Sequence, residues 1–191
     1  MVITGTPGVG KSTLARLLAE ELGAELVDLG ELVEREGLHE GEDPETGSLL
    51  VDLDVLSKRV LELISSRPGG LLVVEGHYAH EVVPREAVLL VFVVRRDPRE
   101  LKGILERRGY SGRKLYENLQ AEILDVCLTE AVRRYGEELI YEVDATGRDA
   151  GDVASEMISA LGSRSGGRVG VVDWLGLLEE EGSLSEFFSE L

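Results

Sequence analysis

The sequence predicts an α/β fold in which a five-stranded parallel sheet is flanked by helices on both faces. Two apolar runs, "LLVVEG" and "AVLLVFVV", are short, continuous and rich in β-branched residues, as is typical of strands buried on both faces. The second observation is the order of the patterns, since apolar runs alternate with segments of helical spacing along most of the chain. Such alternation favours a parallel sheet covered by crossover helices.

The first part of the chain contains two expected strands and one helix. Val2 and Ile3 close a short strand, and residues 4–10 form a loop. The stretch "KSTLARLLAEELG" predicts a helix, because its leucines repeat every three or four residues and it ends on a glycine stop signal. A second short strand follows in "AELVDLG". From Glu31 to about Gly47 the chain is then strongly acidic and rich in turn residues.

The rest of the chain continues the alternation. The stretch "DLDVLSKRVLELISS" predicts a helix ended by "RPGG", and the two apolar runs described above are the third and fourth strands. Between Pro98 and Tyr135, two helical segments are interrupted by "RRGYSGRK". The fifth strand is "LIYEV", and "RDAGDVASEMISALG" is the closing helix.

Residues 1–162 are expected to form one domain, because 191 residues with 43% apolar and 30% charged residues suit a single globular unit. The stretch "SRSGGR" indicates a linker, which begins an acidic C-terminal extension over residues 163–191. Two outcomes are open for this extension. It can dock as a short amphipathic segment around Trp174, or it can remain partly disordered.

Charge and composition narrow the class of partner. The net charge of −17 disfavours direct binding to nucleic acid and suits a basic protein, although solubility or a hot or salty environment would explain it equally well.

No apolar run approaches the roughly 18 residues of a membrane-spanning helix. The first strand is expected to begin almost at Met1, so we expect no signal peptide. Because Cys127 is the sole cysteine, an internal disulfide is impossible, and we expect a cytoplasmic protein.

The stretch "GTPGVGKS", from Gly5 to Ser12, matches the pattern G-x-x-x-x-G-K-[ST] at every fixed position. The glycines of this pattern let backbone N–H groups turn toward phosphate oxygens, and the following helix adds the positive end of its dipole. Lys11 can reach the outer phosphates, and the Ser12 hydroxyl can bind Mg²⁺. Because a strand precedes the motif and an amphipathic helix follows it, the sequence predicts a P-loop that binds a nucleotide such as ATP.

A second candidate site follows the third strand, in "LLVVEGHYAHEVVP". Glu75 stands at the carboxyl end of that strand, where P-loop proteins place an acid on the magnesium side. His77 lies two residues further on and could orient an attacking water or an acceptor hydroxyl. A helix-capping acid and an ordinary loop histidine would explain the same residues. The P-loop upstream favours the catalytic interpretation.

Basic residues follow the fourth and fifth strands. Four of them surround a glycine-containing turn between two helical segments: Arg107, Arg108, Arg113 and Lys114. Phosphoryl transfer needs cations on the outer phosphate oxygens and the exclusion of water, so we interpret this turn as a small closing lid. After the fifth strand, Arg148 could stack on a nucleotide base, although a plain helix cap by Asp149 explains that loop nearly as well.

Together, "GTPGVGKST", "LGELVEREGLHEGEDPE", "VVEGH" and "RRGYSGRKLYENLQAEI" resemble the adenylate kinase isoenzyme 6 family in order and spacing. This family comprises archaeal and eukaryotic adenylate-kinase-like ATPases associated with small-ribosomal-subunit assembly. The resemblance covers about residues 1–161. It implies an adenylate-kinase-like core with a nucleoside-monophosphate-binding insert at about residues 28–51 and a short lid at about residues 107–117.

The resemblance and the motifs together assign roles to particular residues. ATP would contact Gly8, Gly10, Lys11, Ser12, Thr13 and Arg108, with Arg148 near the base, while Ser12 and Glu75 would bind Mg²⁺. The catalytic set would be Lys11, Glu75, His77 and Arg108, and the acceptor would meet Arg35 and Arg113.

Two positions depart from the family. Glu75 stands where Asp is common, and Glu34 stands where a basic residue is common, with Arg35 next to it. On a helix, this shift of one place turns a side chain by about 100°.

Three functions are open at this point. The first is a nucleoside monophosphate kinase of broad specificity, ATP + AMP = 2 ADP, which the insert and the basic lid support. The second is an assembly factor whose ATP hydrolysis releases a basic platform protein during maturation of the small ribosomal subunit and its 16S or 18S rRNA. The third is a dedicated metabolic kinase of a nucleotide or a small metabolite, with no ribosomal role. We predict an adenylate kinase that also hydrolyses ATP and acts in ribosome assembly.

Overall fold

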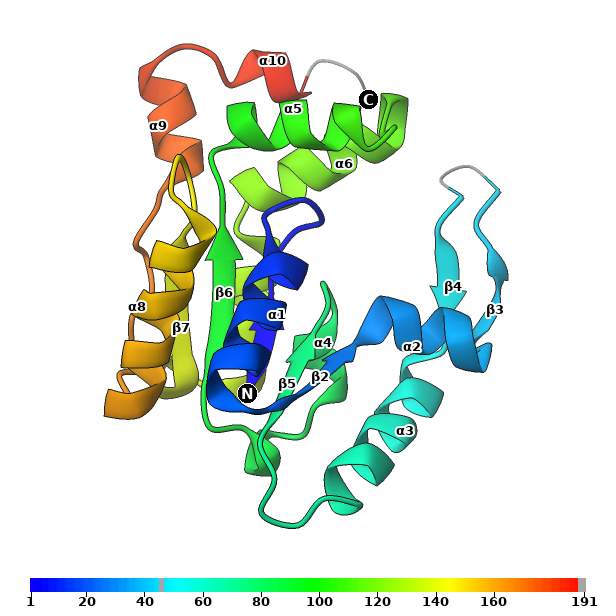
Figure 1. Cartoon of the computed structure of the whole chain (residues 1–191). Helices are drawn as coiled ribbons and strands as arrows, with labels where there is room; N and C mark the ends of the chain where they lie inside the picture. Colours follow the sequence, from blue (N-terminus) through cyan, green and yellow to red (C-terminus); the bar gives the residue numbers. More distant parts are fainter. Residues whose placement is uncertain (45–46, 189–191) are drawn as a thin grey trace.

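The computed structural model describes residues 1–44 and 47–188, in which five strands form one parallel sheet (Figure 1). The strands are β1 (Val2–Thr4), β2 (Glu25–Asp28), β5 (Leu72–Glu75), β6 (Val91–Arg95) and β7 (Ile140–Asp144). Their order across the sheet is β2-β5-β1-β6-β7, and each neighbouring pair is parallel. The predicted five-stranded parallel sheet is therefore confirmed.

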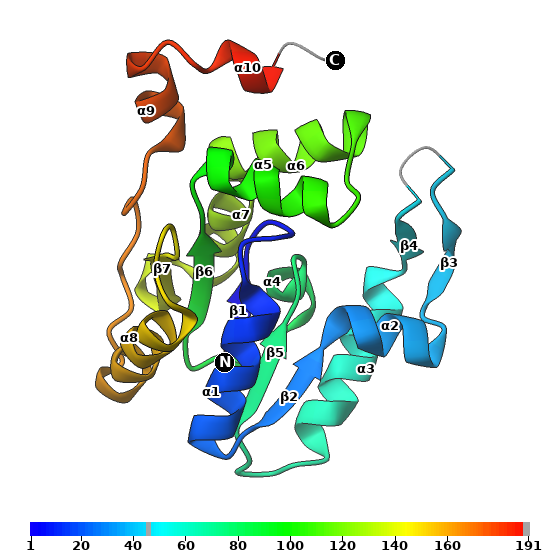
Figure 2. The same cartoon turned by 45° about the horizontal axis from the view of Figure 1, so that its top comes forward.

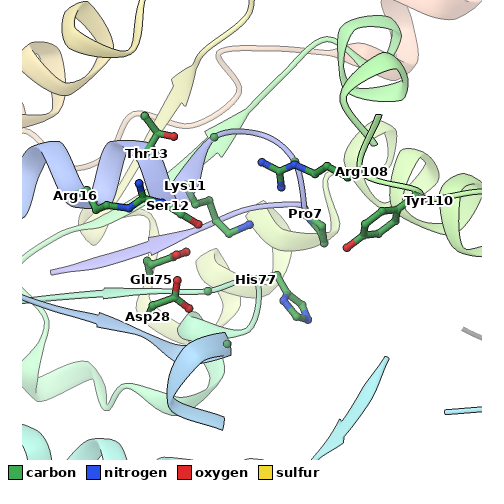
Figure 3. A pocket seen from close by; sticks show the side chains of 14 residues that line it. Pro7, Lys11, Ser12, Thr13, Arg16, Asp28, Glu75, His77, Arg108 and Tyr110 are labelled. Carbon is green, nitrogen blue, oxygen red and sulfur yellow. The ribbon is translucent and has the colours of Figure 1, made fainter. Parts of the chain in front are cut away.

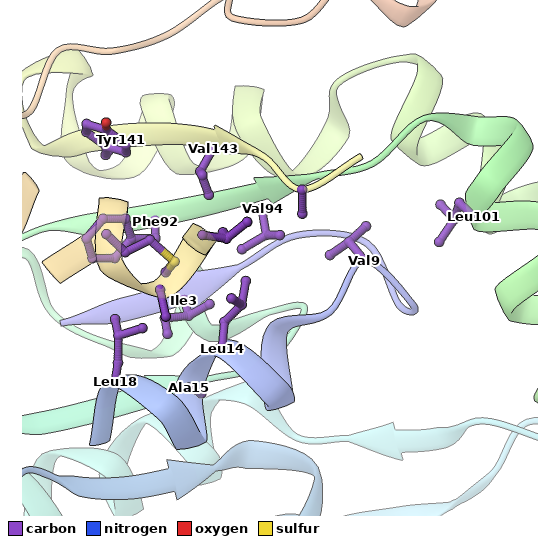
Figure 4. Close-up of a cluster of buried hydrophobic side chains, with 14 of the residues drawn as sticks. Ile3, Val9, Leu14, Ala15, Leu18, Phe92, Val94, Leu101, Tyr141 and Val143 are labelled. Atoms are coloured by element: carbon purple, nitrogen blue, oxygen red, sulfur yellow. The ribbon is translucent and has the colours of Figure 1, made fainter. Parts of the chain in front are cut away.

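Helices α1 (Lys11–Leu22) and α8 (Ala150–Ser163) cover one face of the sheet. Leu18 of α1 packs in one apolar cluster with Ile3 of β1 and Phe92 of β6 (Figure 4). The central strands β5 and β6 are buried at every residue, as their continuous apolar runs predict. This packing holds the end of β1, from which the P-loop leaves the sheet, in a fixed position.

Helices α3 (Leu53–Ser65), α4 (Ala79–Val82) and α7 (Val126–Tyr135) cover the opposite face. Their apolar side chains meet the alternate residues of the same strands in a second cluster. The Tyr135 hydroxyl, buried in that cluster, donates to the Val83 carbonyl oxygen at 2.7 Å. The sheet is thus covered by helices on both sides, as predicted.

Two segments extend away from this core. Between β2 and α3, helix α2 (Leu29–Glu36) leads into an antiparallel hairpin of β3 (His39–Glu42) and β4 (Leu49–Val51). Residues 45–46 of the expected insert lie outside the described residues. The sequence does not predict this hairpin, because its acidic, turn-rich segment lacks the alternation of apolar residues that signals a strand.

The second of these segments consists of α5 (Pro98–Arg107) and α6 (Gly112–Ile123), which lie beyond the carboxyl edge of the sheet (Figure 1). Two single turns of 3₁₀ helix, Arg85–Ala87 and Glu137–Leu139, precede β6 and β7. In the part of the chain that the structure describes, no helix is long and apolar enough to cross a membrane.

We call residues 169–188 the tail segment. It comes directly after a short strand-like contact with β7, and its last described helix lies near α6 (Figure 2). Just before it, Arg168 forms an isolated parallel bridge with Tyr141 of β7. Helices α9 (Trp174–Glu180) and α10 (Ser185–Phe188) then contribute their apolar residues to the cluster that contains α6. The tail segment is thus docked on the domain, and the last three residues of the expected extension, 189–191, lie outside the described residues.

Candidate functional site

The P-loop, residues 5–12, turns tightly because its glycines adopt backbone conformations that other residues rarely take. Gly5, Gly8 and Gly10 have φ values of 138°, 93° and 112°. At Gly5 there is also no space for a side chain, since a Cβ there would collide with the carbonyl oxygen of Val94. A loop of this kind at the start of α1 presents backbone N–H groups to an anion at the positive end of the helix.

Lys11 is the first residue of α1, and its side chain lies buried against the P-loop. Its Nζ donates to the Thr6 carbonyl oxygen at 3.0 Å. Burial lowers the pKa of this ammonium group, and the nearby Glu75 carboxyl partly opposes the effect. Because an ammonium group has three donors, Lys11 retains capacity to bind the oxygens of an anion, which would stabilise its charged form.

The carboxyl groups of Glu75 and Asp28 lie side by side near Ser12 (Figure 3). The parallel register of β2 and β5 places Asp28 directly opposite Glu75. The pKa of Glu75 is raised to about 7, chiefly by burial and also by Asp28, although a hydrogen bond with Ser12 partly opposes the rise. These three side chains gather oxygen atoms at one edge of the P-loop.

This set of oxygen donors fits Mg²⁺, which is usually bound by one or two carboxylates and takes its other ligands from phosphates and water. Among the described residues, no group of three or more His, Cys, Asp and Glu side chains forms a cage for a metal ion. The site therefore suits a cation shared with a phosphate ligand better than a cation held by protein alone.

His77 lies on the loop after β5, beside the P-loop (Figure 3). Its side chain is exposed by surface area at the mouth of the cavity, and the ring of its neighbour Tyr78 packs edge to face at 3.9 Å between centroids. Nearby protein atoms still displace part of the water around the imidazole, and this desolvation, followed by the positive charge of Lys11, lowers the pKa of His77 to about 4. The imidazole is therefore neutral near pH 7 and can accept a hydrogen bond from water.

One open cavity of about 350 Å³ joins these side chains (Figure 3). The P-loop, the first turns of α1, the ends of β2 and β5, and the turn after α5 form its walls. Its lining residues are Pro7, Gly8, Gly10, Lys11, Ser12, Thr13, Arg16, Asp28, Gly30, Glu75, Gly76, His77, Arg108 and Tyr110. The structure thus brings eight sequence-predicted site residues together: Gly8, Gly10, Lys11, Ser12, Thr13, Glu75, His77 and Arg108.

Arg148 lies against a second, smaller cavity of about 110 Å³. Gly10 and Thr13 line both cavities, so the two spaces are adjacent on either side of the start of α1. The guanidinium group of Arg148 pairs with Glu156 at 2.7 Å. The smaller cavity has a largely apolar wall, which includes Leu14.

Arg35 and Arg113 do not line the main cavity as the structure describes it. Arg35 is exposed in the last turn of α2, with its Nη2 atom 3.5 Å from Glu36. Arg113 is exposed in the first turn of α6, where its Nε donates to Glu117 at 2.6 Å. Both side chains would have to be carried toward the P-loop to meet a ligand bound there.

The sequence analysis did not name the other six lining residues as site residues, and three of those six have polar side chains: Asp28, Arg16 and Tyr110. Asp28 carries the same signal as Glu75, because it is an acid at the carboxyl end of an expected strand. What the sequence lacked was the strand order, which makes β2 the neighbour of β5. Arg16 and Tyr110 lie within a helix and a turn that were predicted, but nothing in their spacing indicates that they face the cavity.

A parallel sheet whose first strand runs into this loop and helix defines a P-loop protein of the α/β class. A family model described as an AAA domain, AAA_18, matches residues 1–125. A protein of Methanothermobacter thermautotrophicus named "Putative adenylate kinase" is 43% identical over 92% of this chain and 97% of its own length. A protein of the same name from Methanocaldococcus jannaschii is 37% identical over 91% of this chain and 92% of its own length. The chain therefore belongs to this adenylate-kinase-like family.

Solved structures agree with the fold. A shikimate kinase from Acinetobacter baumannii in complex with shikimate superimposes with a TM-score of 0.60, at 21% identity, over 85% of this chain and 92% of its own. A gluconokinase from Sinorhizobium meliloti gives a TM-score of 0.56, also at 21% identity, over 85% of this chain and 90% of its own. At such identity the likeness shows the shared P-loop fold alone.

Proposed function

We propose that this protein is a nucleoside monophosphate kinase of broad specificity, ATP + AMP = 2 ADP, which also hydrolyses ATP slowly. The observation that carries the proposal is the distribution of charge in the main cavity. Lys11 and Arg108 approach it from the P-loop and the turn after α5, while Glu75 and Asp28 lie on the other side. The relatives named as adenylate kinases, which align over more than nine-tenths of the chain, support the same assignment.

The P-loop would bind the outer phosphates of ATP through its backbone N–H groups and Lys11. Gly10 and Thr13 line both cavities, and Gly8 lines the main one. That cavity, with its apolar wall and with Arg148 at its side, would take the base by stacking and apolar contact. The two adjacent cavities would thus hold the two ends of one nucleotide.

Ser12 and Glu75 would bind Mg²⁺, with Asp28 beside them. The bound ion neutralises charge on the phosphate oxygens during transfer. A carboxyl group must lose its proton to act as a ligand, and the pKa of Glu75 is raised to about 7 by burial. Mg²⁺ binding is therefore expected to strengthen as the pH rises through 7.

Transfer requires cations beside the negatively charged phosphoryl group, and it requires the exclusion of water. Arg108 follows α5 directly and lines the main cavity, so its guanidinium group would supply that charge. Residues 107–117 would close over the nucleotide as a lid, and this motion would bring Arg113 closer to the cavity. Residues 28–51 would bind the acceptor, and Arg35 would contact it only after α2 has moved.

Hydrolysis would use His77. Its neutral imidazole can accept a hydrogen bond from a water molecule placed between β5 and the P-loop, which orients that water for attack. The phosphate of a bound AMP would exclude this water when the acceptor site is filled. The two reactions would therefore compete for one γ-phosphoryl group.

We further propose that the protein acts in maturation of the small ribosomal subunit by binding a basic platform protein. Support comes from the resemblance to the adenylate kinase isoenzyme 6 family and from the net charge of −17, which suits a basic partner. The test is binding of a purified platform protein, measured by calorimetry with ATP and with ADP. Absence of binding in both nucleotide states would leave the metabolic kinase with no ribosomal role as the alternative.

The kinase proposal is tested by following ADP and free phosphate separately, from ATP with and without AMP. We expect ADP formation to rise sharply with AMP, and slow phosphate release to persist without it. His77→Ala should depress phosphate release more than AMP phosphorylation, whereas Glu20→Ala, on the exposed side of α1, should change neither. A wild-type protein whose ADP formation ignores AMP but responds to shikimate or gluconate would refute the assignment.

A further inference from the structure

One buried carboxylate connects the P-loop with the C-terminal end of the chain. Glu122 lies on α6, and its side chain is only 1% exposed. Its Oε2 accepts a hydrogen bond from the Thr6 hydroxyl of the P-loop at 2.6 Å. Its Oε1 accepts from the indole Nε1 of Trp174, in the tail segment, at 3.2 Å. Two elements far apart in the sequence thus share one carboxylate.

The same carboxylate also binds the end of β6. Oε1 accepts from Arg95 Nε at 2.9 Å and from the backbone N–H of Arg96 at 3.1 Å. The Arg95 guanidinium, itself 2% exposed, also pairs with Glu142 at 2.7 Å and with Asp125. One buried guanidinium group therefore pairs with three carboxylates. The neutral donors Thr6 and Trp174 add hydrogen bonds that stabilise the negative charge that remains.

The tail segment enters this network at two points. Besides the indole of Trp174, the backbone N–H of Val171 donates to Glu142 Oε2 at 2.6 Å. Apolar contacts hold the segment in place, since Trp174, Leu178 and Phe187 are all buried in the cluster that contains α6. Gln120 of α6 also donates to the Phe187 carbonyl oxygen at 2.9 Å. The tail segment is therefore both packed on α6 and hydrogen-bonded to the charges beneath the P-loop.

Thr6 links this network to the phosphate-binding lysine. Its hydroxyl donates to Glu122, while its carbonyl oxygen accepts from Lys11 Nζ at 3.0 Å. A displacement of Thr6 would therefore move both the loop and the lysine that acts within it. We propose that the tail segment positions the P-loop through Glu122, the carboxylate shared by Trp174 and Thr6, so that Trp174 is a positioning residue for nucleotide binding.

The proposal rests on the proposed function only in that the P-loop binds ATP, and the experiment separates the two. Trp174→Phe keeps an apolar ring but removes the donor, and Thr6→Val keeps the shape of the side chain but removes the hydroxyl. Amide hydrogen exchange of residues 5–10, measured without nucleotide, reports loop order directly. Affinity for a non-hydrolysable ATP analogue, measured by calorimetry, reports the consequence for binding.

We expect faster loop exchange and about two- to tenfold weaker analogue binding in each single variant, as loss of one such hydrogen bond produces. The double variant should be about as weak as the weaker single variant, because both changes break one connection. Thr6→Ser keeps the hydroxyl and should bind as the wild type does. Asp52→Ala removes the cap of α3, away from Glu122 and the tail segment, so it should lower the melting temperature and leave loop exchange unchanged.

Two results would overturn the proposal. The first is loop exchange in Trp174→Phe equal to that of the wild type. The second is strictly multiplicative weakening of binding in the double variant, which would mean that Trp174 and Thr6 act independently. If AMP fails to stimulate ADP formation, the proposed kinase function fails, but the exchange measurement still decides the role of the tail segment.

Discussion

Replacing Glu75 with glutamine should stabilise the ligand-free protein at alkaline pH and at the same time remove its activity. Glu75 is 3% exposed, and burial disfavours its ionised form. Glutamine has nearly the same size, can accept from Ser12 and can donate to Asp28. The substitution therefore removes the buried charge while the hydrogen bonds of the site are retained.

The magnitude follows from the pKa of Glu75, which is raised from 4.5 to about 7 in the folded protein by burial and by Asp28. The folded state therefore binds this proton more tightly than the unfolded state does. Below pH 4.5 both states are protonated and no penalty exists; the penalty grows as the pH rises and is complete above 7. At about 1.4 kcal/mol for each pH unit between the two pKa values, the wild type loses about 3 kcal/mol by pH 8.

The assay is urea denaturation of wild type and Glu75→Gln without nucleotide or divalent cations, between pH 5 and pH 8.5. The variant should gain little at pH 5 and about 2–4 kcal/mol at pH 8.5. Glu20→Gln, on the exposed side of α1, controls for the loss of one negative charge and should give a small difference at every pH. A difference between wild type and Glu75→Gln that stays constant over this range would refute the reasoning.

Three further predictions concern the P-loop and one helix cap. Lys11→Ala should abolish both AMP-dependent ADP formation and phosphate release, with the fold retained in a thermal melt; residual activity above a few per cent would contradict its role. Gly5→Ala should lower the free energy of unfolding in urea by at least about 2 kcal/mol, because Gly5 has a positive φ and a Cβ there would collide with the Val94 carbonyl oxygen. The control is Gly23→Ala, at a site with open space, and an equal or greater loss in that variant would contradict the prediction. Asp52→Ala should cost about 1 kcal/mol, because the carboxylate caps α3 through two backbone N–H groups, while Asp52→Asn should restore most of that loss.

Much of this fold could be predicted because its signals are local. The P-loop pattern specifies glycines at the positions where φ is positive, and the continuous apolar runs specify strands covered on both faces. Glu75 could be placed for the same reason, since the end of a strand in the sequence is also its end in space. These predictions needed no knowledge of which strand lies beside which.

The rest depends on contacts between distant segments. Asp28 becomes part of the site only because β2 pairs with β5, a strand more than forty residues away in the sequence. The environment of Glu122 is set by Thr6, Arg95 and Trp174, which come from three different parts of the chain. The spacing of residues along one helix could not show which of them faces the cavity, so Arg35 and Arg113 were expected near a ligand and lie exposed outside it.

The contact that precedes the tail segment has a consequence for solubility. Strand β7 is an edge of the sheet, and edge strands offer unpaired backbone groups to the edges of other molecules. Here the N–H of Glu142 donates to the Arg168 carbonyl oxygen at 2.8 Å, and the N–H of Arg168 donates to the Ile140 carbonyl oxygen at 3.2 Å. The chain thereby occupies the edge groups that a second copy would use to extend the sheet. Residues 164–168 therefore cover the edge strand and oppose association of two molecules through their sheet edges. A protein truncated before these residues should aggregate more readily as its concentration rises.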